Sequence, residues 1–305
     1  MIDLHLHLDG SLTPREILSL AELSAVELPT RDERKLAALL SFDGRGTLND
    51  YLKKFEIPLS VLQSAEAVAC AVCSLSERLA ALRYEYAEIR FAPILHTRKG
   101  ASAESILQGA IKGLSDSAFP AKLILCCMRG AEERENLLTV ELAAKYRNQG
   151  VVGVDLAGAE ALYPTDGYKE VFSLASRFGL NITIHSGEAA GADSVKAALD
   201  FGAKRIGHGV RATEEESLLA RIKASDVLIE SCPTSNLQTG AVRSLSQHPV
   251  GLFLERGVPV SLCSDNMTVS DTDLPREWAK TKAALSLSDE ALTRLNDNAR
   301  THEFF

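Results

Sequence analysis

The first ten residues, Met1-Ile2-Asp3-Leu4-His5-Leu6-His7-Leu8-Asp9-Gly10, alternate polar and apolar side chains. Alternate residues of a β-strand point to the same side, so the pattern predicts a strand with His5 and His7 on one face and the leucines on the other. Two imidazoles at this spacing can bind one divalent ion, because neutral imidazole is a preferred ligand of zinc and similar metals. A histidine pair at an exposed strand edge is the alternative interpretation, and the residues downstream decide between the two.

Seven further short apolar segments follow this strand and alternate with segments of helical periodicity. Eight strands separated by helices predict an α/β fold, a parallel (β/α)8 barrel of the TIM type. No linker or low-complexity segment divides the chain, so residues 1–305 are expected to form a single domain. The predicted strands span residues 2–6, 86–91, 122–127, 151–156, 182–185, 205–207, 227–230 and 259–263, and the clearest helices span 102–116, 132–148, 167–178, 192–201 and 214–224.

The first connection, residues 11–83, is much longer than one crossover helix needs, which predicts a helical insertion after the first strand. Leu48, Leu52 and Phe55 recur in it at helical spacing. An insertion there lies on the catalytic face of a barrel, so Leu52 and Phe55 are candidates for substrate contact under a lid. Ordinary core packing of these residues is the alternative. At the opposite end, Met1 lies almost directly on the first strand and the tail, residues 296–305, is short, so little chain is expected to cover the barrel floor.

The composition, with 46% hydrophobic and 24% charged residues, is that of an ordinary soluble globular protein. The net charge of −8 argues against nucleic-acid binding, which needs a basic surface, but it is compatible with a small nucleoside ligand. No apolar run reaches the length of a membrane-spanning helix, and no secretory signal is found. The six cysteines are therefore expected to be reduced thiols in the cytoplasm. Nothing in the sequence indicates the oligomeric state.

Polar residues gather at the C-terminal ends of the predicted strands, the face on which barrel enzymes place their sites. The ends of the fifth, sixth and eighth strands carry most of them. Because these ends converge on the mouth of a barrel, the side chains are predicted to form one site. The three segments are His185-Ser-Gly-Glu188, Gly207-His-Gly209 and Ser264-Asp265-Asn266.

Four polar side chains form a suitable donor set for one divalent ion. Three imidazoles and one carboxylate leave a coordination position open for water, which is typical of catalytic rather than structural zinc. Binuclear barrel hydrolases bridge two metals with a modified lysine at the fourth strand, but here that strand ends at Gly158 without a lysine. We therefore expect a single ion, zinc or another divalent metal. The predicted ligands are His5, His7, His185 and Asp265.

The same donor set predicts a hydrolytic reaction. A divalent ion lowers the pKa of bound water toward about 7 and so provides hydroxide at neutral pH. His208 and Asp265 are placed to take the proton of that water and to orient it. Glu188, three residues beyond a predicted ligand, can deliver a proton to the substrate as a general acid. The expected reaction is attack of hydroxide on an electron-poor carbon, with Glu188, His208 and Asp265 as catalytic residues.

Taken together and in this order, the motifs resemble those of the bacterial adenosine deaminases of the amidohydrolase superfamily. The resemblance extends over nearly the whole chain and also includes a segment similar to the strand-seven motif of the bacterial members. The additional motifs are His5-Leu-His-Leu-Asp-Gly-Ser11, Asp155-Leu-Ala-Gly158 and Ser231-Cys-Pro-Thr-Ser-Asn-Leu-Gln-Thr-Gly240.

The resemblance implies zinc-dependent deamination of adenosine or 2′-deoxyadenosine to inosine or 2′-deoxyinosine, with release of ammonia. Glu188 would protonate purine N1 while hydroxide oriented by His208 attacks C6. Gly158 would contact N3 through its backbone N–H, and Asp9 would accept a hydrogen bond from the ribose 5′-hydroxyl. Asn266, where animal members carry an aspartate, would donate to N7. The residues implied for substrate binding are thus His7, Asp9, Gly158 and Asn266.

Other functions stay open at this point. Another 6-aminopurine compound, adenine or aminodeoxyfutalosine, is an alternative substrate, whereas a carboxylate at the 5′ position would repel the phosphate of AMP. A non-catalytic nucleoside-binding protein could keep the same fold, but the complete set of predicted ligands and catalytic residues argues against it. A polynucleotide-editing deaminase is also disfavoured, because its H-x-E and P-C-x-x-C zinc motif is absent.

Overall fold

All eight predicted strands are present in the computed structural model, which describes residues 1–44 and 46–304. The first and last residue of each strand lie within one residue of the predicted positions. Arg45, inside the predicted insertion, and Phe305, at the end of the chain, lie outside the described residues. The strands are β1 Ile2–His7, β2 Tyr86–Phe91, β3 Ala121–Met128, β4 Val151–Ala157, β5 Asn181–Ser186, β6 Arg205–His208, β7 Leu228–Ser231 and β8 Val260–Leu262.

The strands form one parallel sheet in the order β1 to β8, and the segment after β8 closes it against β1. Leu6 and Asp265 form a parallel bridge at the closure. There the His7 N–H donates to the Asp265 carbonyl at 2.8 Å, and the Asp265 N–H donates to the His5 carbonyl at 2.8 Å. The predicted (β/α)8 barrel is confirmed, and its closure brings the two histidines of β1 next to Asp265.

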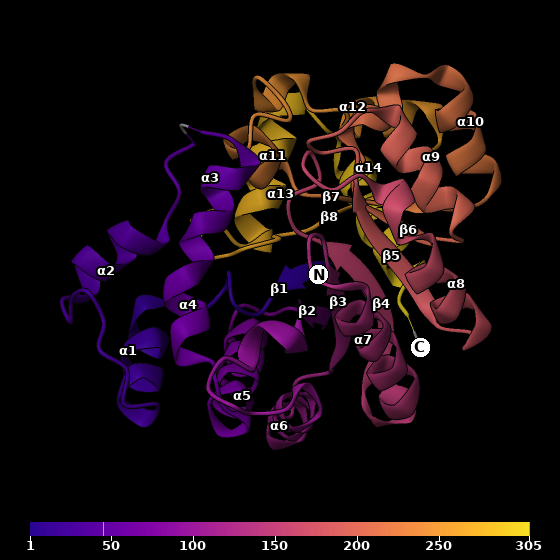
Figure 1. The fold of residues 1–305 in the computed structure, drawn as a ribbon. Coiled ribbons are helices and arrows are strands. Elements are labelled where there is room, and N and C mark those ends of the chain that lie inside the picture. Colours follow the sequence, from indigo (N-terminus) through magenta and orange to yellow (C-terminus); the bar gives the residue numbers. More distant parts are fainter. Residues whose placement is uncertain (45, 305) are drawn as a thin grey trace.

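Helices cover the outside of the barrel (Figure 1). Outward-facing strand residues such as Ile89, Leu125 and Ile206 pack with helix side chains in one large core. Side-chain caps set several helix starts, as at α6, where the Ser102 hydroxyl accepts a hydrogen bond from the Ser105 N–H. The helices after the insertion are α5 Ala65–Ala81, α6 Ala103–Asp116, α7 Glu133–Tyr146, α8 Lys169–Arg177, α9 Ala192–Asp200, α10 Glu216–Ala224, α11 Pro233–Gln238, α12 Val250–Arg256, α13 Leu274–Leu285 and α14 Asp289–Thr301.

The connection from β1 to α5 holds α1 Pro14–Leu23, α2 Glu33–Leu40, α3 Leu48–Leu52 and α4 Glu56–Val61. Figure 1 shows these helices gathered on one side of the barrel, which confirms the predicted helical insertion. Tyr51 packs there against Phe42 and Val269, and Phe55 contacts the same cluster. In the described ranges no single helix has the length and apolarity to span a membrane; Leu48–Val61 and Ala65–Ala81 meet the test only as a pair bent by 116°.

Charged side chains fill the inside of the barrel, where branched apolar residues are usual. Arg90 of β2 and Arg205 of β6 are fully buried. Arg90 pairs with Glu230 at 2.9 Å and with Asp155 at 3.1 Å. Arg205 pairs with Glu230 at 2.8 Å and with Glu88. Because a buried charge is costly without a partner, this network fixes which strand residues face inward.

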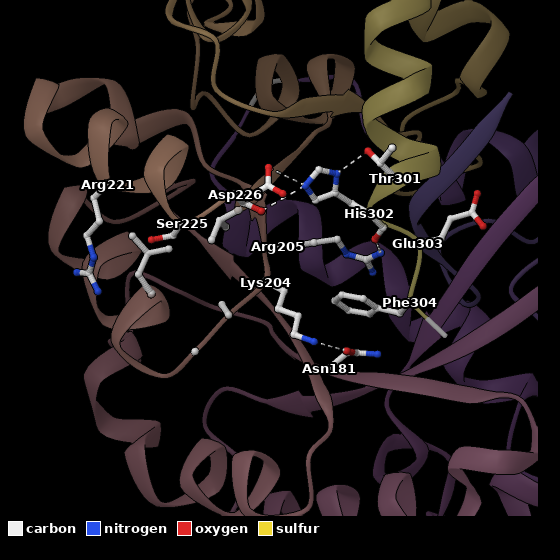
Figure 2. A pocket seen from close by; sticks show the side chains of 14 residues that line it. Asn181, Lys204, Arg205, Arg221, Ser225, Asp226, Thr301, His302, Glu303 and Phe304 are labelled. Atoms are coloured by element: carbon white, nitrogen blue, oxygen red, sulfur yellow. Dashed lines mark hydrogen bonds and ion pairs between the residues drawn. The ribbon is translucent and has the colours of Figure 1, made fainter.

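The C-terminal tail covers the barrel floor, so the expectation drawn from its short length is wrong. Phe304 is buried, and its N–H donates to Glu88 Oε1 at 2.7 Å. Its ring centroid lies 3.5 Å from the Arg205 guanidinium carbon. Figure 2 shows Phe304 and His302 beside Arg205 at a pocket on this side of the barrel. A short tail is sufficient because one aromatic ring both covers the arginine and makes a cation–π contact with it.

Candidate active site

The predicted site residues surround one cavity of about 300 Å³ at the C-terminal ends of the strands. His5 lies deeper and is fully buried. The barrel brings together residues from both ends of the chain, because β1 and β8 are neighbours in the closed sheet. The predicted residues that line the cavity are His7, Asp9, Leu52, Phe55, Gly158, His185, Glu188, His208, Asp265 and Asn266.

The four predicted metal ligands converge, with one ligand atom of each lying within 4.8 Å of the others. His7 Nε2 lies 3.1 Å from His185 Nε2 and 3.4 Å from Asp265 Oδ1. Asp265 Oδ1 also lies 3.4 Å from His5 Nε2. Zinc ligands at about 2.0–2.2 Å from a tetrahedral ion are roughly 3.3–3.6 Å apart, so most of these spacings suit a single ion.

Buried carboxylates hold two of the imidazoles in the tautomer that a metal needs. His5 Nδ1 donates to Glu230 at 2.8 Å, and His185 Nδ1 donates to Asp155 at 2.8 Å. Each ring therefore presents a bare Nε2 to the cluster, and His5 Nε2 is buried without a hydrogen-bond partner among the described residues. Burial lowers the pKa of His7 well below its ordinary value, which keeps this ring neutral. Such orphaned, deprotonated nitrogens fit a metal ion.

The charge balance inside the barrel also fits a divalent cation. Burial alone would raise the pKa of Glu230, but Arg90 and Arg205 beside it lower this pKa below the ordinary range. Asp155 also pairs with Arg90, at 3.1 Å. With neutral imidazoles, the two arginines of this network face four carboxylates, and the buried Asp3 carboxyl group lies on the same face of β1 as His5, so a dication would offset part of the excess negative charge. These side chains are Arg90 and Arg205 against Glu88, Asp155, Glu230 and Asp265.

A second, overlapping group comprises His208, Cys232 and Asp265, whose ligand atoms also lie within 4.8 Å of one another. Burial raises the pKa of the Cys232 thiol well above its ordinary value. A metal binds the thiolate rather than the thiol, so this environment disfavours Cys232 as a ligand. The set of three histidines and Asp265 is therefore the stronger candidate for the metal site.

Glu188 and His208 lie side by side in the cavity wall, with Glu188 Oε2 3.6 Å from His208 Nε2. Glu188 Oε1 accepts hydrogen bonds from the Thr239 hydroxyl at 2.8 Å and from the Asn236 amide at 3.5 Å. His208 and Asp265 have φ angles of 65° and 59°, in the left-handed region that costs energy for residues other than glycine. His208 is the last residue of β6 and Asp265 lies three residues beyond β8, so the strain falls at strand ends that line the cavity.

The predicted substrate contacts lie across the cavity from this pair or beside it. Gly158, with a φ of 107°, presents backbone to the cavity in a conformation that only glycine adopts readily. The Asn266 amide donates to Asp265 Oδ1 at 2.7 Å, which leaves its second N–H for another acceptor. Burial raises the pKa of Asp9 to about 6. Phe55 lines the cavity and also packs against the cluster that contains Tyr51. Its position is therefore compatible with contact to a substrate and with core packing.

Several residues of the site received no role from the sequence. The sequence does contain a signal for Glu230 and Asp155. Strands of a parallel barrel are buried on both faces, so a charged residue inside an apolar strand indicates that it has a buried partner. The sequence contains no such signal for Glu160, since this residue lies in an irregular loop. Its carboxylate nevertheless accepts hydrogen bonds from the backbone N–H groups of residues 187–190 and so holds the loop that carries Glu188.

Known proteins with similar sequences and structures are deaminases. The model of the family described as adenosine deaminase matches residues 1–305. The adenosine deaminase of Haemophilus ducreyi is 46% identical, covering 98% of this chain and 90% of that protein, and the adenosine deaminase of Enterococcus faecalis is 38% identical, covering 99% and 91%. Among solved structures, adenine deaminase from Arthrobacter aurescens has a TM-score of 0.90 at 27% identity, covering 100% of this chain and 93% of that one. The N6-mAMP deaminase of Arabidopsis has a TM-score of 0.88 at 25% identity, with the same coverage. Because the family match runs from end to end and these relatives are matched over nine tenths of their own length, the chain belongs to the adenosine deaminase family.

Proposed function

We propose that this protein is a single-domain enzyme, residues 1–305, that hydrolyses adenosine and 2′-deoxyadenosine to inosine and 2′-deoxyinosine with release of ammonia. The observation that carries the proposal is the position of Glu188 and His208, 3.6 Å apart, at a cavity that also holds a complete set of metal ligands. Two relatives named adenosine deaminase, at 46% and 38% identity, support the substrate. We also place the enzyme in the cytoplasm, because all six cysteines are free.

One zinc ion per chain completes the proposed site. Three imidazole nitrogens and one carboxylate oxygen are ligands that zinc prefers, and two of the rings already present their bare Nε2 atoms. A divalent ion bound there acidifies water, so that hydroxide is available near neutral pH. The ligands are His5, His7, His185 and Asp265.

Two side chains move or hold protons in this proposal. Glu188, in its protonated form, donates to purine N1, which withdraws electron density from C6 and prepares that carbon for attack by hydroxide. Thr239 and Asn236 hold one oxygen of Glu188, so its second oxygen faces the cavity beside His208. His208 orients the attacking water oxygen, and the Asp265 carboxylate takes one of its protons and passes it to the C6 amino group, which leaves as ammonia. The remaining hydroxyl proton returns to Glu188 as the C6 carbonyl forms.

The remaining cavity residues position the nucleoside. The Gly158 N–H donates to purine N3, and the free N–H of the Asn266 amide donates to N7. Asp9 accepts a hydrogen bond from the ribose 5′-hydroxyl, and His7 lies beside the reacting edge of the purine. Leu52 and Phe55 cover the ligand from the insertion, in keeping with cavities that combine apolar walls with a few convergent polar groups.

The test is the ultraviolet change on mixing zinc-loaded protein with adenosine, and then with adenine, AMP and aminodeoxyfutalosine. Rapid conversion of adenosine, with the other compounds slow, is the expected result. Turnover of another aminopurine but not of adenosine would keep the mechanism and refute the substrate. Binding of zinc and adenosine without any turnover would favour a non-catalytic nucleoside-binding protein instead.

Changing Asp9 to alanine is expected to raise KM for adenosine by about 10–100-fold, because a hydrogen bond to a charged group contributes roughly 1.5–3 kcal/mol. KM for 5′-deoxyadenosine should stay nearly constant, since this analogue lacks the hydroxyl that Asp9 contacts. Steady-state kinetics on both nucleosides measures the difference. An equal rise in KM for both nucleosides would show that Asp9 does not bind the 5′-hydroxyl.

Removal of the metal is expected to abolish deamination, and readdition of zinc to restore it. Elemental analysis of the purified protein should give one divalent ion per chain, and His185→Ala should reduce this content while His96→Ala should not. His96 is a matched control because it is buried and bonded to the Leu62 carbonyl, away from the ligand cluster. Two ions per chain, or full activity of metal-free protein, would contradict the proposed site.

A further inference from the structure

His248 is a buried histidine that the proposed mechanism does not use. The backbone N–H of Val250 lies 3.4 Å from its Nδ1, and since a backbone N–H can only donate, Nδ1 accepts. Burial lowers the pKa of His248 to about 3, so the ring is neutral and carries one proton. That proton is therefore on Nε2, which lies 3.1 Å from Asn236 Oδ1.

The His248 N–H fixes the orientation of the Asn236 amide. With Oδ1 accepting from His248, the Nδ2 group faces two atoms of the active site, His208 Nδ1 at 2.9 Å and Glu188 Oε1 at 3.5 Å. Asn236 is fully buried, so water does not compete for these hydrogen bonds. The Glu188 oxygen independently favours the same orientation, because Oε1 already accepts a hydrogen bond from the Thr239 hydroxyl at 2.8 Å and so faces an N–H rather than an amide oxygen.

The amide orientation in turn decides the tautomer of His208. Because Asn236 donates to His208 Nδ1, this nitrogen carries no proton, and the ring proton of His208 is therefore on Nε2. Nε2 is the atom that lies 3.6 Å from Glu188 Oε2 at the cavity. A flipped amide would reverse the assignment and turn a ring lone pair toward the Glu188 carboxylate.

We propose that His248 is a positioning residue that, through Asn236, fixes His208 as the Nε2–H tautomer and holds the Glu188 carboxyl group in place. His208 then presents a hydrogen-bond donor to the attacking oxygen, and Asp265 is the group that receives the proton. The catalytic consequence rests on the proposed function, whereas the tautomer of His208 does not.

The tautomers are measured by nitrogen-15 NMR of zinc-loaded protein labelled at its histidine rings, since protonated and bare ring nitrogens resonate far apart. We expect Nε2–H for His208 and for His248 in the unmodified protein. His248→Phe keeps a ring but removes the donor, so it should shift His208 partly or wholly to the Nδ1–H form. His96→Phe removes a buried histidine outside the relay and should leave His208 unchanged. An Nδ1–H form of His208 in the unmodified protein would overturn the proposal.

Kinetics supplies the second readout. Loss of a side chain that orients a catalytic imidazole typically costs about 10–100-fold in activity, so His248→Phe should lower kcat for adenosine by that factor with little change in KM. His248→Gln, which retains an N–H donor, should recover most of kcat. Unchanged kcat in folded His248→Phe would refute the positioning role.

If that variant does not fold, Asn236→Asp, which replaces the donor amide by an acceptor of the same size, is expected to give the same change of His208 tautomer. A wild-type protein without deaminase activity would refute the proposed function and leave the tautomer result standing.

Discussion

Replacement of Glu188 by glutamine is expected to lower kcat for adenosine by about 10²–10⁴-fold while the metal stays bound, because a positioned general acid contributes a factor of this size. Glutamine keeps the size of the side chain and can still contact Thr239 and Asn236, but it has no carboxyl proton to give to purine N1. The loss should appear in kcat more than in KM, since the proton is transferred only as the transition state forms.

The measurement combines steady-state kinetics with elemental analysis of the same preparation. Glu215→Gln is the matched control, because Glu215 is a partly exposed glutamate paired with Lys196 at 2.6 Å, outside the cavity. Its kcat should equal that of the unmodified protein. Near-normal kcat in Glu188→Gln would remove Glu188 from the mechanism, and loss of zinc from this variant would show instead that Glu188 supports the metal site.

Replacement of Arg90 by methionine is expected to lower the free energy of unfolding by about 3–5 kcal/mol, the usual cost of leaving a buried charge without its partner. Arg90 is fully buried between Asp155 and Glu230, and each carboxylate also accepts a hydrogen bond from Nδ1 of a histidine proposed as a metal ligand. Within the described part of the chain, removing the guanidinium therefore leaves Asp155 without an arginine partner and Glu230 with Arg205 alone, and we expect weaker zinc binding together with the loss of stability.

Urea unfolding of the zinc-loaded and zinc-free proteins measures this effect. Arg221→Met provides the control, since Arg221 pairs with Asp200 at 2.7 Å on the surface, where about 0–1 kcal/mol is expected. A change below 1 kcal/mol in Arg90→Met would mean that the two carboxylates take up protons or water without cost, contrary to a charged network inside the barrel.

The sequence by itself determined the fold class, the strands and which of its candidate polar residues gather at one cavity. The strand bounds could be predicted to within one residue because alternation and short apolar runs are local properties of the chain. Once the barrel was expected, the site followed, since residues at the C-terminal ends of parallel strands share one mouth. This is why Glu188, His208 and the four proposed ligands can be predicted to share a site, and all of them lie around one cavity or directly beneath it.

Only the tertiary structure decided which buried groups lie behind that site. His5 meets Glu230 from 225 residues away, and Arg90 meets Asp155 from 65 residues away. Periodicity tells which residues of a strand share a face, but the partners of those residues depend on the stagger and closure of the whole sheet. The same limit applies to the tail, whose length gave no indication that Phe304 would cover Arg205. It applies also to His248, which precedes α12 and lies outside every motif of the sequence. Its hydrogen bond to Asn236 of α11 forms only once the barrel has brought these segments together.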